Sequence, residues 1–159
     1  MSEQSPQDKQ AQLRERELIK RRSKARHLAV QAVYQWQLAA TDTADLLAQF
    51  HEDEGMDKAD GEYFDGLVRA CIGDPDRLKG VYADYLDRPE VQLDPVERAI
   101  LMVAAHELQE HLEVPWRVVL DEAVSLARRF GAEDSHRFIN AVLDKASAEL
   151  RKLERGAGR

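Results

Sequence analysis

KRRSKARHLAVQAVYQWQLAA, residues 20–40, is the segment around which the rest of this chain is expected to pack. Its apolar residues recur every three or four positions, on one face of a helix: Ala25, Leu28, Ala29, Ala32, Val33, Trp36, Ala39 and Ala40. No Gly or Pro interrupts the run, so we expect one helix from Lys20 to about Thr41. Packing of this face would hold the cations at the start of the helix in place. A fixed group of cations favours nucleic-acid binding over a catalytic pocket.

The whole chain of 159 residues is long enough for one domain. Its hydrophobic content is 43%, and no apolar run reaches the length of about 18 residues that a membrane span needs. The N-terminus lacks the apolar segment of a secretory signal. A single cysteine, Cys71, excludes an internal disulfide framework and fits a reducing cytosol. We therefore expect a cytoplasmic protein.

The net charge of -7 is unevenly distributed along the chain. Residues 9–26 hold eight Lys or Arg against two Glu, a net charge of +6, whereas residues 27–159 carry -11. Charges more than about 8 Å apart are largely screened at physiological ionic strength, so local charge matters more than the total. We therefore expect the basic end to bind RNA. The alternative is a solvated, disordered basic tail, which fits residues 1–19 better than residues 20–27.

The remaining sequence predicts six more helices, most of them begun by an Asp or Ser cap. They are expected from Asp42 or Thr43 through Phe50, from about Tyr63 to Gly73, from Pro75 to about Leu86, from Pro95 to about Leu112, from after Pro115 to Gly131, and from about Ser135 to Leu153. Gly131 is expected to end its helix in the left-handed conformation. No segment shows the alternation of a strand. The predicted class is all-α, with about seven helices.

Motifs for catalysis or for cofactor binding are missing. There is no phosphate-binding GxxxxGK[ST] loop. His106 and His111 are five residues apart rather than the four of a zinc-binding helix, so exposed histidines are the better interpretation. Cys71 lies on an apolar face and is most simply a small core residue. We expect no enzyme, no metal and no cofactor.

A second informative stretch is GAEDSHRFINAVL, residues 131–143. A turn here precedes the start of a helix, where free amides attract anions, and Arg137 adds a charge. Phe138 could stack on a base and Asn140 could hydrogen-bond a base edge, as in single-stranded RNA recognition. The alternative is a helix capped by Asp134 or Ser135, with Phe138 in the core and Asn140 bonded to the backbone.

Four ordered blocks of this sequence resemble the NusB family: RRSKARHLAVQAVYQWQL (21–38), LDPVERAILMVAAHEL (93–108), VPWRVVLDEAVSLARRFG (114–131) and FINAVLDKA (138–146). The resemblance covers about residues 20–148. It implies an all-α fold of two helical subdomains, about 20–88 and 89–154, which together form one RNA-binding domain. Residues 1–19 would be a flexible basic extension, and residues 155–159 a flexible tail.

The resemblance also implies a function without catalysis. Such a protein would bind the single-stranded boxA element of nascent ribosomal RNA leaders together with NusE, a small-subunit ribosomal protein. The pair would join RNA polymerase and other Nus factors, suppress termination and support ribosomal RNA processing. Implied RNA contacts are Arg22, Ser23, Lys24, Arg26, Tyr85, Arg88, Asp134, Arg137 and Phe138, to which the reasoning above adds Asn140. Glu97 represents the implied NusE face, and Tyr34 a buried support.

One departure from the family pattern concerns the site directly. Ser23 interrupts what is often a continuous basic run, and Arg14, Arg16 and Lys20 could compensate for the lost charge. Two other functions remain open at this point. One is a relative of the RNA-binding domain of a ribosomal RNA cytosine methyltransferase, although such an enzyme needs a long catalytic domain and this chain ends at Arg159. The other is a helical adaptor that binds only proteins through its acidic face.

Overall fold

The computed structural model describes residues 3–157, and these residues form eight α-helices and three 3-10 helices, without a strand among them. The elements are α1 (Pro6–Ala39), α2 (Thr43–His51), η1 (Glu54–Lys58), α3 (Gly61–Gly73), α4 (Pro75–Tyr82), η2 (Ala83–Tyr85), η3 (Glu90–Gln92), α5 (Pro95–Glu110), α6 (Trp116–Phe130), α7 (Ser135–Leu150) and α8 (Lys152–Ala157). The predicted all-α class is confirmed. No described helix has the length and apolarity needed to cross a membrane.

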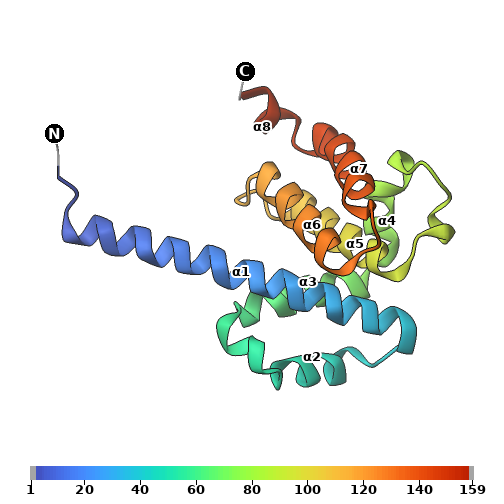
Figure 1. Ribbon diagram of the computed structural model, residues 1–159, viewed down its shortest axis with the longest axis horizontal. Coiled ribbons are helices and arrows are strands. Elements are labelled where there is room, and N and C mark those ends of the chain that lie inside the picture. The colour runs from blue at the N-terminus through green and yellow to red at the C-terminus, as the bar shows by residue number, and fades with distance from the viewer. Residues whose placement is uncertain (1–2, 158–159) are drawn as a thin grey trace.

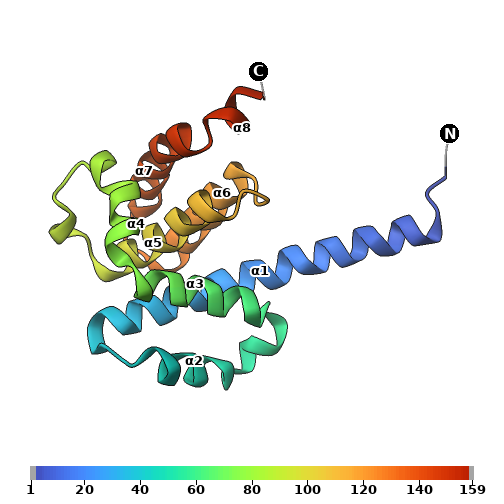
Figure 2. The same cartoon turned by 180° about the vertical axis from the view of Figure 1, so that it is seen from behind.

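Helix α1 runs through the middle of the molecule, and the other helices are arranged on its two sides (Figures 1 and 2). α2, η1 and α3 lie on one side of it, and α5 and α6, followed by α7, on the other. α5 also packs against α3, α4, α6 and α7, so it joins the two sides. The predicted boundary near residues 88 and 89 falls between η2 and η3, and the division into two subdomains stays a prediction.

Four of the eight described α-helices begin at an aspartate that accepts hydrogen bonds from the first turn. The side chains of Asp42, Asp60, Asp74 and Asp94 each accept from a backbone N–H two or three residues further on, at 3.2, 3.0, 3.2 and 2.8 Å. Such caps satisfy amides that have no partner inside the helix. These local signals explain why most predicted starts agree with the structure.

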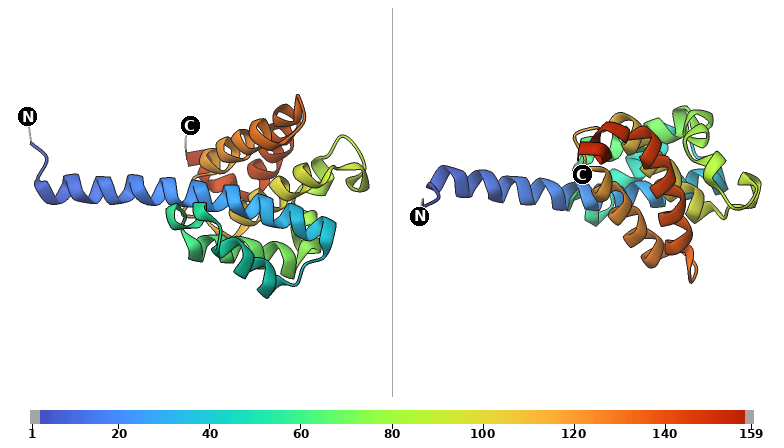
Figure 3. Two further views of the ribbon diagram at one scale, coloured as in Figure 1. Left: turned by 60° about the horizontal axis from the view of Figure 1, so that its bottom comes forward. Right: turned by 90° about the horizontal axis from the view of Figure 1, so that it is seen from above.

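The start of α1 differs from the prediction. The helix begins at Pro6 rather than Lys20, so residues 6–19 are helical and not the flexible extension that we expected. The Ser5 side chain accepts from the Asp8 N–H at 3.1 Å, and Pro6 occupies the first helical position. Figure 3 shows this part of α1 projecting from the body. Residues 1–2 of the predicted extension lie outside the described residues.

The core is built on the predicted face of α1, on which Ala25, Ala29 and Val33 are fully buried. Cys71 is also fully buried, and burial raises the pKa of its thiol to about 12, which makes the group unreactive. Tyr34 is placed differently from our expectation. Its side chain is 38% exposed because it lies on the outward side of α1, so it is not a buried support.

Arg151 divides the last predicted helix into α7 and α8, and its side chain closes the end of α5. It is 3% exposed, and its guanidinium donates to four backbone carbonyls at 2.8 to 3.1 Å. These carbonyls belong to Glu107, Leu108, His111 and Val114. A helix end leaves such carbonyls without a partner, so Arg151 acts as a C-terminal cap from another part of the chain.

α8 also holds the start of α6, where Pro115 offers no side-chain cap. Glu154 accepts from the Trp116 N–H at 2.9 Å, and the Arg155 guanidinium lies 4.0 Å from the centre of the Trp116 ring. Residues 155–157 are helical, and Arg155 contacts the body, while the flexibility of this tail stays a prediction. Residues 158–159 lie outside the described residues.

Two histidines make folding sensitive to pH. Burial, together with His111 and Arg77, lowers the pKa of His106 from 6.5 to about 4, and burial, Lys24 and Arg129 lower that of His27 to about 4. Between pH 4 and 6.5 the unfolded chain therefore binds protons that the folded chain does not. The stabilisation is complete above pH 6.5 and is lost as the pH falls towards 4.

We expect the free energy of unfolding to fall between pH 6.5 and 5, and to fall less in the His106→Gln variant. Urea titrations at pH 7, 6, 5.5 and 5 measure this, in a range above that in which most carboxylates titrate. An unchanged pH dependence in the variant would show that His106 does not contribute.

Candidate nucleic-acid interface

The first predicted RNA-binding group, in the middle of α1, contains a buried arginine. Arg26 is 3% exposed, and its Nε lies 2.7 and 2.9 Å from the two carboxylate oxygens of Glu107, which is 1% exposed. Burial opposes the charge of Arg26, but the hydrogen bond and charge of Glu107 raise its pKa above the ordinary value. The Tyr63 hydroxyl donates to the same carboxylate. The structure thus places Arg26 in the core, not at an RNA surface.

Arg22 and Ser23 are half-buried and face neighbouring helices. The Arg22 guanidinium lies 4.5 Å from the centre of the Tyr63 ring, and its Nε is 3.7 Å from an Asp60 oxygen. The Ser23 hydroxyl donates to Glu122 of α6 at 3.0 Å. This contact gives the serine within the basic run a structural role, because it joins α1 to α6.

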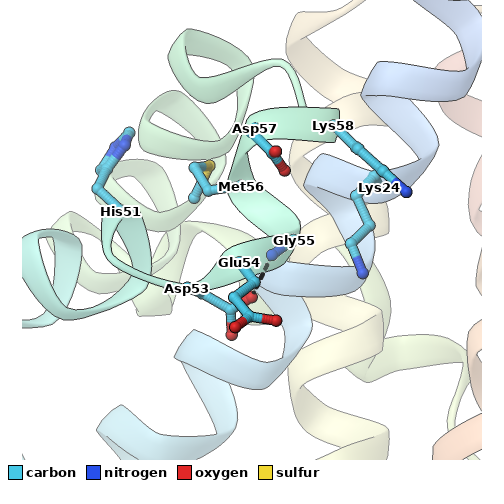
Figure 4. A pocket seen from close by; sticks show the side chains of 8 residues that line it. All are labelled: Lys24, His51, Asp53, Glu54, Gly55, Met56, Asp57 and Lys58. Carbon is cyan, nitrogen blue, oxygen red and sulfur yellow. Dashed lines mark hydrogen bonds between the residues drawn. The ribbon is translucent and has the colours of Figure 1, made fainter.

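Lys24 lies at the edge of an acidic depression of about 830 Å³ (Figure 4). The connection from α2 to α3 supplies the rest of the lining: His51, Asp53, Glu54, Gly55, Met56, Asp57 and Lys58. The Asp53 carboxylate accepts from the Gly55 N–H at 2.7 Å and fixes the turn below Lys24. These carboxylates repel a phosphate, so RNA would reach Lys24 from the side of Lys20, which is exposed.

The second predicted group is assembled from the connection between α4 and α5 and from the start of α7. The Arg88 guanidinium lies 4.1 Å from the centre of the Phe138 ring, and Arg88 Nε donates to Asp87 at 2.8 Å. Phe138 is half-buried and packs against the core, as does Tyr85. A cation stacked on an anchored aromatic ring leaves the other face of its plane open to a base.

Glu97 holds this arrangement together from below. It is 6% exposed, it accepts from the Ser135 hydroxyl at 2.8 Å, and its other oxygen lies 3.9 Å from Arg88. Glu97 therefore fixes α7 and Arg88 to α5 instead of completing a capping box with Asp94. Glu97 is thus buried, and its part in a contact with NusE stays a prediction.

The turn before α7 has an unusual backbone. Asp134 has a φ of 70°, in the left-handed region that Asp tolerates better than most residues, and its side chain makes no cap hydrogen bond. Gly131 is not left-handed, contrary to our expectation, since its φ is -87°. It is required for space, because an added Cβ would lie 2.7 Å from the Ala127 carbonyl oxygen.

On its solvent-facing side, the second group presents charged side chains and one side-chain amide. Arg137 is 79% exposed with its Nε 3.9 Å from Asp134, which is 71% exposed, and Asn140 is exposed one turn further along α7. Arg137 and Asn140 lie about 60° apart on the solvent side of α7, while Phe138 points about 100° away from Arg137 towards Arg88. We refer to Arg88, Phe138, Arg137 and Asn140 as the α7 platform.

The structure does not join the two predicted groups into one cluster. Among the described residues, the α1 group contacts α3, α5 and α6, whereas the α7 platform contacts Glu97 and the connection before α5. We did not predict from the sequence that Glu107 pairs with Arg26 in the core. A signal was present, since Ile100, Val103 and Glu107 share one helix face and thus place a carboxylate on an apolar side.

Fold and platform define a small all-helical protein with a cation–aromatic surface of the type that contacts bases. The NusB family model matches residues 23–148. Transcription antitermination protein NusB of Paraburkholderia xenovorans is 47% identical over 138 residues, which is 87% of this chain and 96% of that protein. The namesake of Idiomarina loihiensis is 49% identical over 125 residues, 79% of this chain and 90% of that protein. The chain belongs to the NusB family.

Solved structures share the fold. The NusB of T. maritima matches with a TM-score of 0.72 and 27% identity, covering 80% of this chain and 90% of that one. A crystal structure of the antitermination factors NusB and NusE in complex with dsRNA matches with a TM-score of 0.66 and 23% identity, covering 80% and 96%. The second likeness shows the fold alone.

Proposed function

We propose that this protein is a non-enzymatic transcription antitermination factor that binds the boxA element of nascent ribosomal RNA leaders together with NusE. The pair would join RNA polymerase and other Nus factors and support transcription and processing of ribosomal RNA. Membership of the NusB family supports the general function. A structure of the same fold that contains NusE and dsRNA fits RNA and NusE as partners.

The observation that carries the proposal is the stacking of Arg88 on Phe138 at 4.1 Å. The Arg88 guanidinium is already oriented in the free protein, because its Nε donates a hydrogen bond to Asp87 and the Glu97 carboxylate lies 3.9 Å from it. A base can stack on the exposed face of the guanidinium plane while Arg137 contacts a phosphate. On the α1 side, Lys24 and the exposed Lys20 are the cations best placed for phosphates, with Arg22 and Ser23 beside them; Arg26 has no direct part.

Replacing Arg88 by Ala is expected to weaken binding of boxA RNA by about 1–3 kcal/mol, the usual contribution of one stacked base. Arg88→Lys keeps the positive charge but lacks the planar guanidinium on which a base can stack. We therefore expect this variant to bind RNA nearly as weakly as Arg88→Ala does, with the same salt dependence as the unsubstituted protein. Fluorescence anisotropy with labelled leader RNA, titrated at several salt concentrations, measures both quantities.

A matched control is Arg117→Ala. Arg117 is exposed and lies 4.9 Å from the centre of the Trp116 ring, so it is also stacked on an aromatic ring but far from the platform along the chain. Its replacement should leave the affinity unchanged. Full recovery in Arg88→Lys would show that Arg88 acts only as a charge.

One comparison distinguishes an RNA-binding protein from an adaptor that binds only proteins. Gel shifts with leader RNA and a scrambled RNA, each with and without NusE, should show sequence-dependent binding that NusE strengthens. NusE would enlarge an RNA surface that is small in this acidic protein. Binding of NusE without any RNA shift would favour the adaptor that recognises only proteins.

A further inference from the structure

The projecting part of α1, residues 6–20, lies outside the segment that matches the family model, residues 23–148. Every one of its side chains is exposed, and it extends away from the body (Figure 3). A helix of this length measures about 22 Å. It adds a long solvated surface to the side of α1 on which Lys24 lies.

The cations of this segment are not spread evenly around the helix. At about 100° per residue, Lys9, Arg16 and Lys20 fall within about 40° of one another, and Lys24 follows within a further 40° or so. Neighbouring members are about 6 to 10 Å apart along the axis. We call Lys9, Arg16, Lys20 and Lys24 the α1 stripe.

Two of the three acidic side chains of the segment lie away from the stripe. Asp8 and Glu15 are each about 100° from the adjacent cation, whereas Glu17 lies about 60° from Lys20 and about 20° from Lys24. Arg14 is on the far side, about 160° from Arg16. The stripe therefore keeps a net positive charge, with four cations and one carboxylate at its edge.

The arginines of α1 that lie in the body are engaged, unlike the cations of the stripe. The ion pairs of α1 begin at Arg22, which faces Asp60 and Glu113, and continue with Arg26, which faces Glu107 and Glu122. Among residues 3–157, no cation of α1 before Arg22 makes an ion pair. On α1, phosphates would thus meet cations without an ion pair along the projecting segment and at Lys24.

We propose that the α1 stripe binds the phosphates of the single RNA strand that flanks the element held by the body. This inference rests on the proposed function and extends its α1 group to Lys9 and Arg16, which lie outside the family match. RNA fits better than a membrane surface, because the apolar residues Leu13, Leu18 and Ile19 lie about 100° or more apart around the helix and form no common apolar face.

The test compares a short boxA RNA with the same RNA extended by about ten nucleotides at each end, in salt titrations with the full chain. Each phosphate neutralised on a single strand contributes about 0.7 to the slope of log K against log salt. Lys9→Gln and Arg16→Gln combined should lower the slope by about 1.4 for the extended RNA only. The affinity at physiological salt should fall by roughly tenfold or more.

Two variants separate a stripe from unspecific charge. Arg14→Gln removes the same charge as Arg16→Gln from the opposite side of the helix, so it should change binding little, while Arg16→Gln weakens it about threefold to fivefold. Arg16→Glu with Glu17→Arg keeps composition and net charge but turns the cation by about 100°, and it should also bind more weakly. Circular dichroism checks that α1 stays helical.

The outcomes are distinct. Equal effects of Arg14→Gln and Arg16→Gln, or no gain in affinity from the flanking RNA, would overturn the stripe while leaving the proposed function standing. Failure of the short RNA to bind would instead overturn the proposed function. Binding to vesicles of phosphatidylserine and phosphatidylcholine that Arg16→Gln abolishes, without any effect on extended RNA, would assign the stripe to a membrane surface and overturn the proposal.

Discussion

Replacing Arg26 by Ala should lower the free energy of unfolding by about 3–5 kcal/mol, because it leaves a buried carboxylate without its cation. Glu107 is 1% exposed, and Arg26 supplies both of its charged hydrogen bonds, at 2.7 and 2.9 Å. The loss would also weaken the attachment of α1 to α5 and α6, since Arg26 lies 3.8 Å from Glu122 as well. Urea unfolding followed by circular dichroism measures the change.

Controls distinguish this buried pair from a general effect of charge on α1. Arg14→Ala removes an exposed cation from the same helix and should change stability by no more than about 0.5 kcal/mol. Removing both charges and the hydroxyl, with Arg26→Met, Glu107→Leu and Tyr63→Phe, should cost less than Arg26→Ala alone. A stable Arg26→Ala protein with lost RNA binding would contradict the structural role and return Arg26 to the RNA surface.

Replacing Arg151 by Ala should destabilise the protein by roughly 3–5 kcal/mol, since hydrogen bonds from a charged group are strong and buried carbonyls without partners are costly. The carbonyls of Leu108 and Val114 would lose their donor, those of Glu107 and His111 would keep only a backbone N–H, and Glu154 would lose a partner at 2.6 Å. Arg151→Lys should recover only part of the loss, because an ammonium cannot match the planar fork of a guanidinium.

The neighbouring Lys152 is the matched control, because it is 71% exposed and pairs only with Glu149 across 3.7 Å. Lys152→Ala should change stability by no more than about 0.5 kcal/mol. Hydrogen exchange adds a local measure: amides near the end of α5 and the start of α6 should exchange faster in Arg151→Ala. Equal stability of the two alanine variants would show that Arg151 is not the cap of α5.

The two arginines meet at one residue. Arg26 binds the side chain of Glu107, and Arg151 binds its backbone carbonyl at 3.1 Å. Substitutions that share a partner are rarely additive. Both arginines therefore serve to fix α5 between α1 and α8, and with α5 they fix the position of Glu97 beneath the α7 platform.

Sequence patterns were sufficient for the helices because their causes are local. A cap such as Asp94, with Pro95 behind it, acts within one turn, and the apolar face of α1 follows from spacing alone. The same logic would have extended α1 to Pro6, since Ser5, Pro6 and Asp8 form a complete start signal. The absence of an apolar face in residues 6–19 led to the opposite expectation, although packing is not the only source of helix.

The site was predicted in part. The residue types of the stretch from Asp134 to Asn140 indicate RNA binding, and the structure places Phe138 beside Arg88 and leaves Arg137 and Asn140 exposed on α7. The α1 group was less well predicted, because charge in a sequence does not show which cations are paired. Arg26 and Glu107 are 81 residues apart, so no local pattern around Arg26 indicated its partner.

The order of residues alone settles the helical class, the face of each helix that packs and the family, because periodicity, caps and motif spacing are properties of short segments. Folding in three dimensions settles which charged side chains meet solvent. Whether a guanidinium can bind a ligand at the surface depends on whether a carboxylate from elsewhere in the chain is buried beside it. Glu107 is buried beside Arg26, whereas no carboxylate is buried beside Arg16 among the described residues. Desolvation and pairing are consequences of packing, and they decide the chemistry of this protein's surface.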